Sequence, residues 1–290
     1  MSSVEVVGVV GCGLMGSGIA EVAARSGCDV TVLEFDDAAV KRGLDRVRTS
    51  LDTAVRRGKL APEDGALALS RISVGADAGA LAGCTMVIEA VPEDADAKTS
   101  VFRLLDEVVE RSDAVLASNT SSIPIMKLAM ATRRPEHVVG LHFFNPVPVM
   151  PLVEVVASLL TGDDAVARAN RMATEVLGKH VVRSQDRAGF VVNALLVPYL
   201  LSAMRMLESG FATAEDIDAG MMRGCGHPMG PLTLTDLIGL DTTMAVAESL
   251  YEEFKEPLFA PPPLLSRMVD AGLLGRKTGR GFYDYPAQVA

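Results

Sequence analysis

One histidine of this chain has a carboxylate placed to assist it in proton transfer. The four histidines are His137, His142, His180 and His227, and histidine is the commonest general base near neutral pH. His142 follows an apolar run that predicts a strand, and Glu154 lies twelve residues later within a second apolar run. A carboxylate in a buried strand is costly unless it is paired. We therefore expect Glu154 to orient the His142 ring and stabilise its imidazolium form; a purely structural ion pair is the alternative.

A glycine-rich turn near the start of the chain has the spacing of a dinucleotide-binding site. Gly11, Gly13 and Gly16 match the pattern G-x-G-x-x-G directly after a predicted strand. These glycines allow a tight turn, the approach of a pyrophosphate and close packing of a helix on the strand. The helix begins with Leu14 and Met15. Its free N–H groups would bind the phosphates, although a glycine turn of purely structural role is the alternative.

The second predicted strand ends with an acidic residue that bears on the choice of cofactor. Glu34 comes eighteen residues after Gly16, where its carboxylate can accept hydrogen bonds from a ribose diol. A 2′-phosphate at that place would be repelled by the like charge. Residues 35–37 include no arginine to relieve the repulsion. The sequence therefore predicts NAD, and not NADP, as the cofactor.

The elements that position these residues follow an alternating pattern. Short β-branched runs alternate with helical segments up to Asp186, which predicts a Rossmann-like domain with a mainly parallel sheet. Residues 36–69 contain two helical segments and no strand, so we expect a helical hairpin inserted in this domain. Helical periodicity alone follows Asp186. We expect an NAD-binding domain over residues 1–186 and an all-α domain for substrate binding and dimerisation over residues 187–290.

Composition and charge exclude several classes of protein. The net charge of −10 argues against a nucleic-acid binder. Residues 190–207 are apolar around nearly the whole helix but include Asn193 and Pro198, which indicates a buried or subunit-contact helix and not a membrane span. We expect a homodimer. Four scattered cysteines without a C-x-x-C pair argue against a metal site and suit the reducing cytoplasm, where such cysteines are mostly buried.

The helical hairpin is basic in an acidic chain. Between residues 41 and 59 there are seven lysines and arginines against two aspartates, a local net charge of +5. A solvated helix face is the ordinary explanation for such a run. The alternative is a binding site for a polyanionic ligand, because phosphate groups bind to clustered cationic side chains.

The remaining motifs resemble those of the L-3-hydroxyacyl-CoA dehydrogenases, and more narrowly the single-function bacterial 3-hydroxybutyryl-CoA dehydrogenases. The resemblance spans essentially the whole chain in order. The motifs that carry it are Met15-Gly-Ser-Gly-Ile-Ala20, Ser118-Asn-Thr-Ser-Ser122, Leu141-His-Phe-Phe-Asn-Pro146, Val147-Pro-Val-Met-Pro-Leu-Val-Glu154, Gly189-Phe-Val-Val-Asn193, His227-Pro-Met-Gly-Pro231 and Lys277-Thr-Gly-Arg-Gly-Phe-Tyr283.

The resemblance implies reversible NAD-dependent oxidation of a (3S)-3-hydroxyacyl-CoA to the 3-ketoacyl-CoA. It implies that His142 is the base and Glu154 its orienting partner, and that Ser121 and Asn193 hold the 3-oxygen of the substrate. The implied cofactor contacts are Glu93, Lys98, Ser121, Asn145 and Lys277, and the implied contacts to coenzyme A are Ser50 and Arg57.

Three positions depart from the family pattern. Glu34 replaces the more usual aspartate, Arg57 stands where relatives often have lysine, and Pro151 replaces a common lysine. The first two changes keep the charge of the side chain, and the third has no clear consequence for the chemistry. Two other functions are the alternatives: a dehydrogenase of a free hydroxy acid such as L-gulonate, and a non-enzymatic crystallin or nucleotide sensor.

Overall fold

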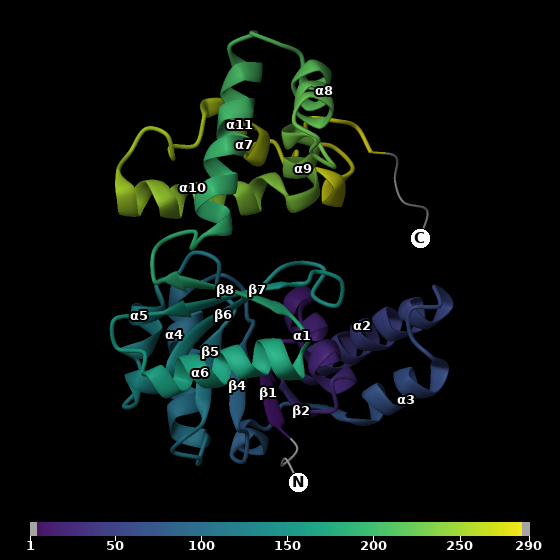
Figure 1. Ribbon diagram of the computed structural model, residues 1–290, viewed down its shortest axis with the longest axis vertical. Helices are drawn as coiled ribbons and strands as arrows, with labels where there is room; N and C mark the ends of the chain where they lie inside the picture. The colour runs from purple at the N-terminus through teal and green to yellow at the C-terminus, as the bar shows by residue number, and fades with distance from the viewer. Residues whose placement is uncertain (1–4, 286–290) are drawn as a thin grey trace. The chain divides into compact units, whose positions relative to one another are not determined.

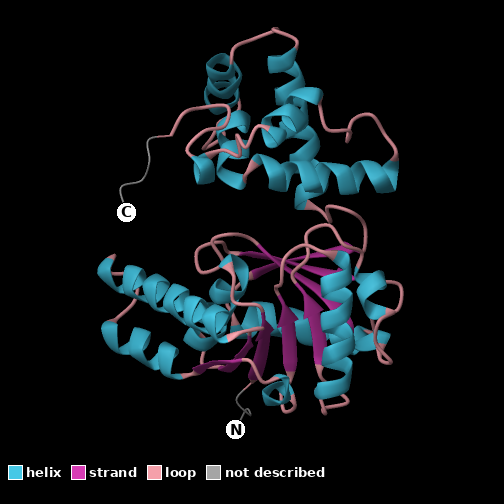
Figure 2. Cartoon of the chain, turned by 180° about the vertical axis from the view of Figure 1, so that it is seen from behind, coloured by secondary structure: helices cyan, strands magenta, loops and turns pink. Residues whose placement is uncertain are grey.

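The computed structural model describes residues 5–285 and divides them into two compact units. The first unit extends to residue 187 and contains a sheet with helices around it, and the second begins at residue 188 and is helical (Figures 1 and 2). The expected fold class, a mainly parallel Rossmann-like domain followed by an all-α domain, is confirmed.

Within residues 5–187, the sheet of the first unit has eight strands in the order β3-β2-β1-β4-β5-β6-β7-β8. All neighbouring strands are parallel except β6 and β7, which are antiparallel. Most are rich in valine and isoleucine, as expected for strands covered on both faces. Their bounds are β1 (Val6–Val10), β2 (Asp29–Leu33), β3 (Ile72–Gly75), β4 (Met86–Glu89), β5 (Val115–Ser118), β6 (Val138–Phe143), β7 (Leu152–Ala157) and β8 (His180–Gln185).

Helices connect the parallel strands, and the predicted hairpin is present as α2 and α3. In Figure 1 these two helices extend away from the sheet on the side of α1, against which both pack. The helices of this unit are α1 (Leu14–Arg25), α2 (Asp37–Arg56), α3 (Pro62–Ser70), α4 (Ala95–Val108), α5 (Ile125–Ala129) and α6 (Asp163–Arg171), with short turns η1 (Ala78–Leu81), η2 (Pro135–His137) and the π-helical η3 (Met172–Val176).

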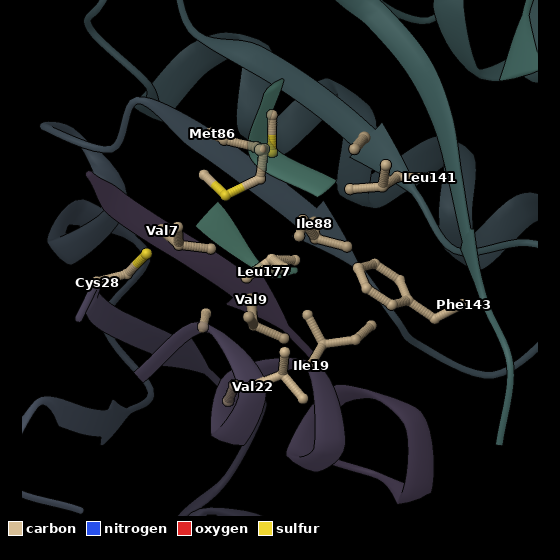
Figure 3. Close-up of a cluster of buried hydrophobic side chains, with 14 of the residues drawn as sticks. Val7, Val9, Ile19, Val22, Cys28, Met86, Ile88, Leu141, Phe143 and Leu177 are labelled. Atoms are coloured by element: carbon tan, nitrogen blue, oxygen red, sulfur yellow. The ribbon is translucent and has the colours of Figure 1, made fainter. Parts of the chain in front are cut away.

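The apolar core of the sheet unit fixes the glycine turn in place. Val7 and Val9 of β1, Met86 and Ile88 of β4, and Ile19 of α1 lie in one apolar cluster (Figure 3), and each is at most 2% exposed. Burial of such side chains supplies most of the folding free energy. Because β1 and α1 are both held by this core, the turn that joins them has a fixed position at the carboxyl end of the strand.

The described part of the second unit, residues 188–285, contains five α-helices around a core of its own. Leu200, Leu201 and Leu250 are completely buried there. Thr213 caps α8 by accepting a hydrogen bond from the N–H of Asp216. The elements are α7 (Val192–Glu208), α8 (Ala214–Gly224), α9 (Pro231–Ile238), α10 (Leu240–Phe254), α11 (Pro263–Asp270) and the turn η4 (Arg276–Thr278).

One sequence expectation needs correction. The strand that was expected to end at Leu141 continues to Phe143, so His142 lies within β6 and not in the loop after it. Three of the four cysteines are buried, as expected for most free cysteines, and Cys225 is exposed. Among the described residues, no helix combines the length and apolar character that crossing a membrane requires.

Candidate functional site

The antiparallel pairing of β6 with β7 places His142 directly opposite Glu154. The Nδ1 atom of His142 lies 2.8 Å from Oε2 of Glu154, a charge-assisted hydrogen bond. His142 is 4% exposed and Glu154 is completely buried. The cost of burying the carboxylate is therefore offset by its histidine partner, as the sequence argument required.

The carboxylate determines which nitrogen of the ring faces the other way. Because Glu154 accepts the Nδ1–H, the neutral ring has its acceptor lone pair on Nε2. The hydroxyl of Ser121 lies 2.9 Å from this Nε2 atom. The three side chains form a continuous hydrogen-bonded chain that leads from a buried charge to a half-exposed hydroxyl. Such a chain can accept and return a proton at Nε2 of His142, beside the Ser121 hydroxyl.

Ser121 is held by the loop that follows β5. The Oε1 atom of Glu93 accepts hydrogen bonds from the backbone N–H groups of Ser121 at 2.9 Å and Ser122 at 3.0 Å, and from the hydroxyl of Thr120. Asn119 Oδ1 accepts the N–H of Phe143 at 2.8 Å and so joins the loop to β6 beside the histidine. The sequence predicts that Glu93 belongs to the site. It does not predict that Asn119 joins the loop to β6, because no local sequence pattern indicates this contact.

Glu93 also faces a buried cation. Its partial burial acts to raise the pKa, but the Lys98 ammonium 3.3 Å away and the hydrogen bonds from residues 120–122 lower the pKa of Glu93 below its usual value. The carboxylate is consequently ionised at neutral pH and accepts hydrogen bonds from the loop. Lys98 itself is only 1% exposed. The structure thus joins two of the predicted cofactor residues to the serine loop.

The glycine turn has the geometry that a dinucleotide needs. Gly11 has φ +88°, which favours glycine, and a Cβ on Gly16 would lie 1.8 Å from the carbonyl oxygen of Gly11. A Cβ on Gly13 would meet no atom within 4 Å, so the space in front of the turn is open. Leu14 and Met15 form the first turn of α1, and Gly13 provides no side-chain cap for it. These residues fit a pyrophosphate bound at the helix N-terminus.

Glu34 lies directly after β2, and its carboxylate accepts a hydrogen bond from the N–H of Cys12 in the glycine turn. The sequence next to Glu34 contains no arginine, but the fold brings an arginine from α2 to the glycine turn. Arg46 of α2 donates to the carbonyl of Cys12 at 3.1 Å. The cationic hairpin therefore reaches the edge of the dinucleotide site, which local sequence could not show.

A cavity of about 860 Å³ lies along α1, α2 and the loop between β6 and β7. Ser50 and Arg57 both line it, as does Asn145 from the loop. The other cationic residues in its wall are Arg25, Arg42, Arg46 and Lys59. Four of the seven basic residues of the hairpin thus face one cavity, which favours a binding role over a solvated helix face.

Two predicted site residues belong to the helical unit. Asn193 lies in the first turn of α7, and Lys277 lies in η4, where its ammonium contacts both carboxylate oxygens of Asp241, one of them at 2.6 Å. His227 is also in this unit and contacts the hydroxyl of Tyr199. Within residues 5–285, no three acidic, cysteine or histidine side chains are grouped as a metal site.

Residues 6–187 match the model of the 3-hydroxyacyl-CoA dehydrogenase NAD binding domain, and residues 189–285 match that of the 3-hydroxyacyl-CoA dehydrogenase C-terminal domain. The chain belongs to the 3-hydroxyacyl-CoA dehydrogenase family. Because the first domain of this family binds NAD, the cofactor prediction from the glycine turn is confirmed. The resemblance inferred from the motifs is confirmed as well.

Full-length relatives and structures agree with this membership. A 3-hydroxybutyryl-CoA dehydrogenase of Mycobacterium tuberculosis is 57% identical over 283 residues, which are 98% of this chain and 99% of the relative. The crystal structure of M. tuberculosis FadB2 has a TM-score of 0.97 at 57% identity and covers 98% of this chain and 100% of its own. That of (S)-3-hydroxybutyryl-CoA dehydrogenase PaaH1 from Ralstonia eutropha has a TM-score of 0.93 at 45% identity, with coverages of 98% and 100%.

The position of Glu34 beside the glycine turn predicts a preference for NADH over NADPH. The carboxylate repels a 2′-phosphate, so kcat/KM with NADH should exceed that with NADPH at least tenfold, or about 1.4 kcal/mol. Combining Glu34→Ala with Phe35→Arg should narrow this ratio, because the repulsion is removed and a cation is added. Steady-state rates with a 3-ketoacyl-CoA measure both cofactors, and equal efficiencies in the unmodified enzyme would contradict the prediction.

Proposed function

We propose that this enzyme interconverts (3S)-3-hydroxybutyryl-CoA and acetoacetyl-CoA with NAD. The observation that carries the proposal is the hydrogen-bonded chain of Ser121, His142 and Glu154, which ends at a hydroxyl suited to hold a substrate oxygen. The substrate is that of relatives which match this chain over nearly its whole length. The proposal includes a preference for a substrate with a short acyl chain, as in 3-hydroxybutyryl-CoA.

The proton moves through the imidazole of His142. In the oxidation, Nε2 accepts the proton of the 3-hydroxyl, and in the reverse reaction the imidazolium returns it to the forming alkoxide. Glu154 holds the ring in the required tautomer and stabilises the imidazolium. Ser121 holds the 3-oxygen, and we assign the same role to Asn193. When bound, NAD would supply the acceptor for the hydride from C3.

Binding of the cofactor falls to the glycine turn and to the polar residues around it. Gly11, Gly13 and Gly16, with Leu14 and Met15, are proposed to hold its pyrophosphate, and Glu34 its ribose. Further contacts are assigned to the side chains of Glu93, Lys98, Ser121, Asn145 and Lys277.

Recognition of coenzyme A is assigned to the cavity beside α2. Coenzyme A has a 3′-phosphate and a pyrophosphate, and Arg57 with its cationic neighbours can neutralise these groups while Ser50 donates a hydrogen bond. A free hydroxy acid such as L-gulonate has no group that needs this cavity. A crystallin or a nucleotide sensor would need neither the cavity nor the buried pair of His142 and Glu154.

The reducing cytoplasm is the proposed compartment. Burial raises the pKa of the Cys12, Cys28 and Cys84 thiols to about 11, so few of these groups are thiolates at neutral pH. Thiols of this kind act as small apolar side chains and persist where disulfides are not formed.

The oxidation of NADH in the presence of acetoacetyl-CoA tests the proposed reaction. We expect turnover that depends on the thioester, with the (3S)-alcohol as the product. Oxidation of free L-gulonate at a higher efficiency would support the free-acid alternative, and NADH binding without turnover of either substrate would support the nucleotide sensor.

Replacing the proposed base should lower the rate of the chemical step. His142→Ala should reduce kcat about 10²- to 10⁴-fold while NADH still binds, because a general base contributes about that factor. Glu154→Gln keeps the size of the side chain but removes the charge that stabilises the imidazolium. This variant should therefore reduce kcat by a factor comparable to that of His142→Ala. The double variant should be little worse than His142→Ala alone, since the two residues act as one unit. If the kcat losses of the two single variants multiply in the double variant, Glu154 does not act through His142.

Removing a cation from the cavity wall should weaken binding of the thioester. Arg57→Ala should raise KM for acetoacetyl-CoA several-fold and leave KM for NADH nearly unchanged. Arg48→Ala is the matched control, because Arg48 lies on the same hairpin, pairs with Asp45 at 3.9 Å and does not line the cavity. If both KM values of Arg57→Ala rise together, Arg57 has a structural role and its assignment is wrong.

The helical unit is proposed to form a homodimer. Leu195 of α7 is 73% exposed and Phe211 is 79% exposed, so apolar surface of this unit remains uncovered within one chain. We expect analytical ultracentrifugation at micromolar concentration to give twice the chain mass of 30.6 kDa. Leu195→Glu should shift the distribution toward the monomer, and a stable monomer of the unmodified protein would refute the proposal.

A further inference from the structure

Glu89 is a buried carboxylate outside the set of residues proposed to transfer the proton. It is the last residue of β4 and is completely buried. Its Oε1 atom accepts hydrogen bonds from the ammonium of Lys98 at 2.6 Å and the N–H of Val91 at 2.7 Å. Its Oε2 atom accepts one from the hydroxyl of Ser118 at 2.7 Å. Every bond leads to a residue beside the candidate site.

The Lys98 side of this network leads to the serine loop. Lys98 lies between Glu89 at 2.6 Å and Glu93 Oε2 at 3.3 Å, and it also donates to the carbonyl of Val91 at 3.1 Å. Because Glu89 is the nearer carboxylate, Lys98 contacts Glu93 less closely and at its Oε2 atom. The Oε1 atom of Glu93 is then available to the N–H groups of Ser121 and Ser122.

The Ser118 side leads to the same loop from its other end. Ser118 is the last residue of β5 and is completely buried, and its hydroxyl oxygen accepts the N–H of Thr120 at 3.2 Å. One carboxylate therefore fixes both the start of the loop, through Ser118, and the middle of the loop, through Lys98 and Glu93. The hydroxyl of Ser121 contacts His142 from that loop at 2.9 Å.

We propose that Glu89 is a positioning residue for proton transfer: it keeps the Ser121 hydroxyl aligned with Nε2 of His142. This inference rests on the proposed function of Ser121 and His142. When Glu89 loses its charge, the Lys98 ammonium has only Glu93 as a carboxylate partner and turns toward it. Glu93 then leaves the N–H groups of the loop, and Ser121 loses its alignment.

The test is a double-mutant cycle of Glu89→Gln with Ser121→Ala, measured as kcat with acetoacetyl-CoA at saturating NADH. Glu89→Gln keeps the size of the side chain. It should lower kcat about tenfold or more and change KM for acetoacetyl-CoA less than twofold, because the cavity with Ser50 and Arg57 is not altered. In the Ser121→Ala background Glu89→Gln should have almost no further effect, since the loop then has no hydroxyl to align.

Asp106→Asn is the matched control for loss of a buried ion pair. Asp106 lies on α4 with Lys98, is 9% exposed and accepts hydrogen bonds from Arg133 at 2.7 Å and Arg134 at 3.1 Å. This substitution should lower the Tm and leave kcat unchanged. A purely structural role for Glu89 would give the same result as this control.

Two outcomes would overturn the proposal: a Glu89→Gln enzyme with normal kcat, or an equal loss of kcat with and without the Ser121 hydroxyl. If Glu89→Gln does not fold, Ser118→Ala tests the other side of the network, and its smaller loss of kcat should also disappear in the Ser121→Ala background. Turnover of acetoacetyl-CoA by the unmodified enzyme is measured first, so that a failure of the proposed reaction is distinguished from a failure of the proposed role of Glu89.

Discussion

The one antiparallel pairing in the sheet, between β6 and β7, determines the chemistry of this protein. It brings residues twelve apart in the sequence to directly opposed positions, so that Glu154 contacts the ring of His142 at 2.8 Å. A parallel strand next to β6 would need a long crossover connection, so residues only twelve apart could not lie opposite each other. The loop between the strands also lines the cavity beside α2 through Asn145. One reversal of the chain thus determines the pairing of His142 with Glu154, the tautomer of His142 and part of the cavity wall.

Buried charge is concentrated at the carboxyl ends of the central strands. Glu89 is the last residue of β4, Ser118 is the last residue of β5, and His142 lies in β6 next to its end. The Ser118 hydroxyl donates to Glu89 and accepts the N–H of Thr120, and the Ser121 hydroxyl contacts His142. Charges in such a setting are stable only when their partners are complete. The same requirement that makes these groups costly to bury also makes their geometry well defined, which suits a site that must hold a proton donor and acceptor in alignment.

The sequence allowed accurate prediction where the signal is local. The glycine turn and Glu34 follow from spacing within one strand, turn and helix, and the pairing of His142 with Glu154 follows from the cost of an isolated buried carboxylate. The strand boundary was wrong because a polar side chain at position 142 interrupts the apolar pattern while the backbone ladder continues. The reach of Arg46 to Cys12, 34 residues away, depends on how α2 packs, and no local pattern predicts it.

The basic hairpin has a consequence for how ligands arrive. The chain as a whole has a net charge of −10, whereas residues 41–59 have a local net charge of +5. Four of the basic side chains of this stretch line the cavity, and Arg46 also contacts the glycine turn. We expect electrostatic steering to guide anionic ligands toward this stretch, at a rate that falls as ionic strength rises. Repulsion by the acidic remainder of the chain should reduce unproductive encounters elsewhere on the surface.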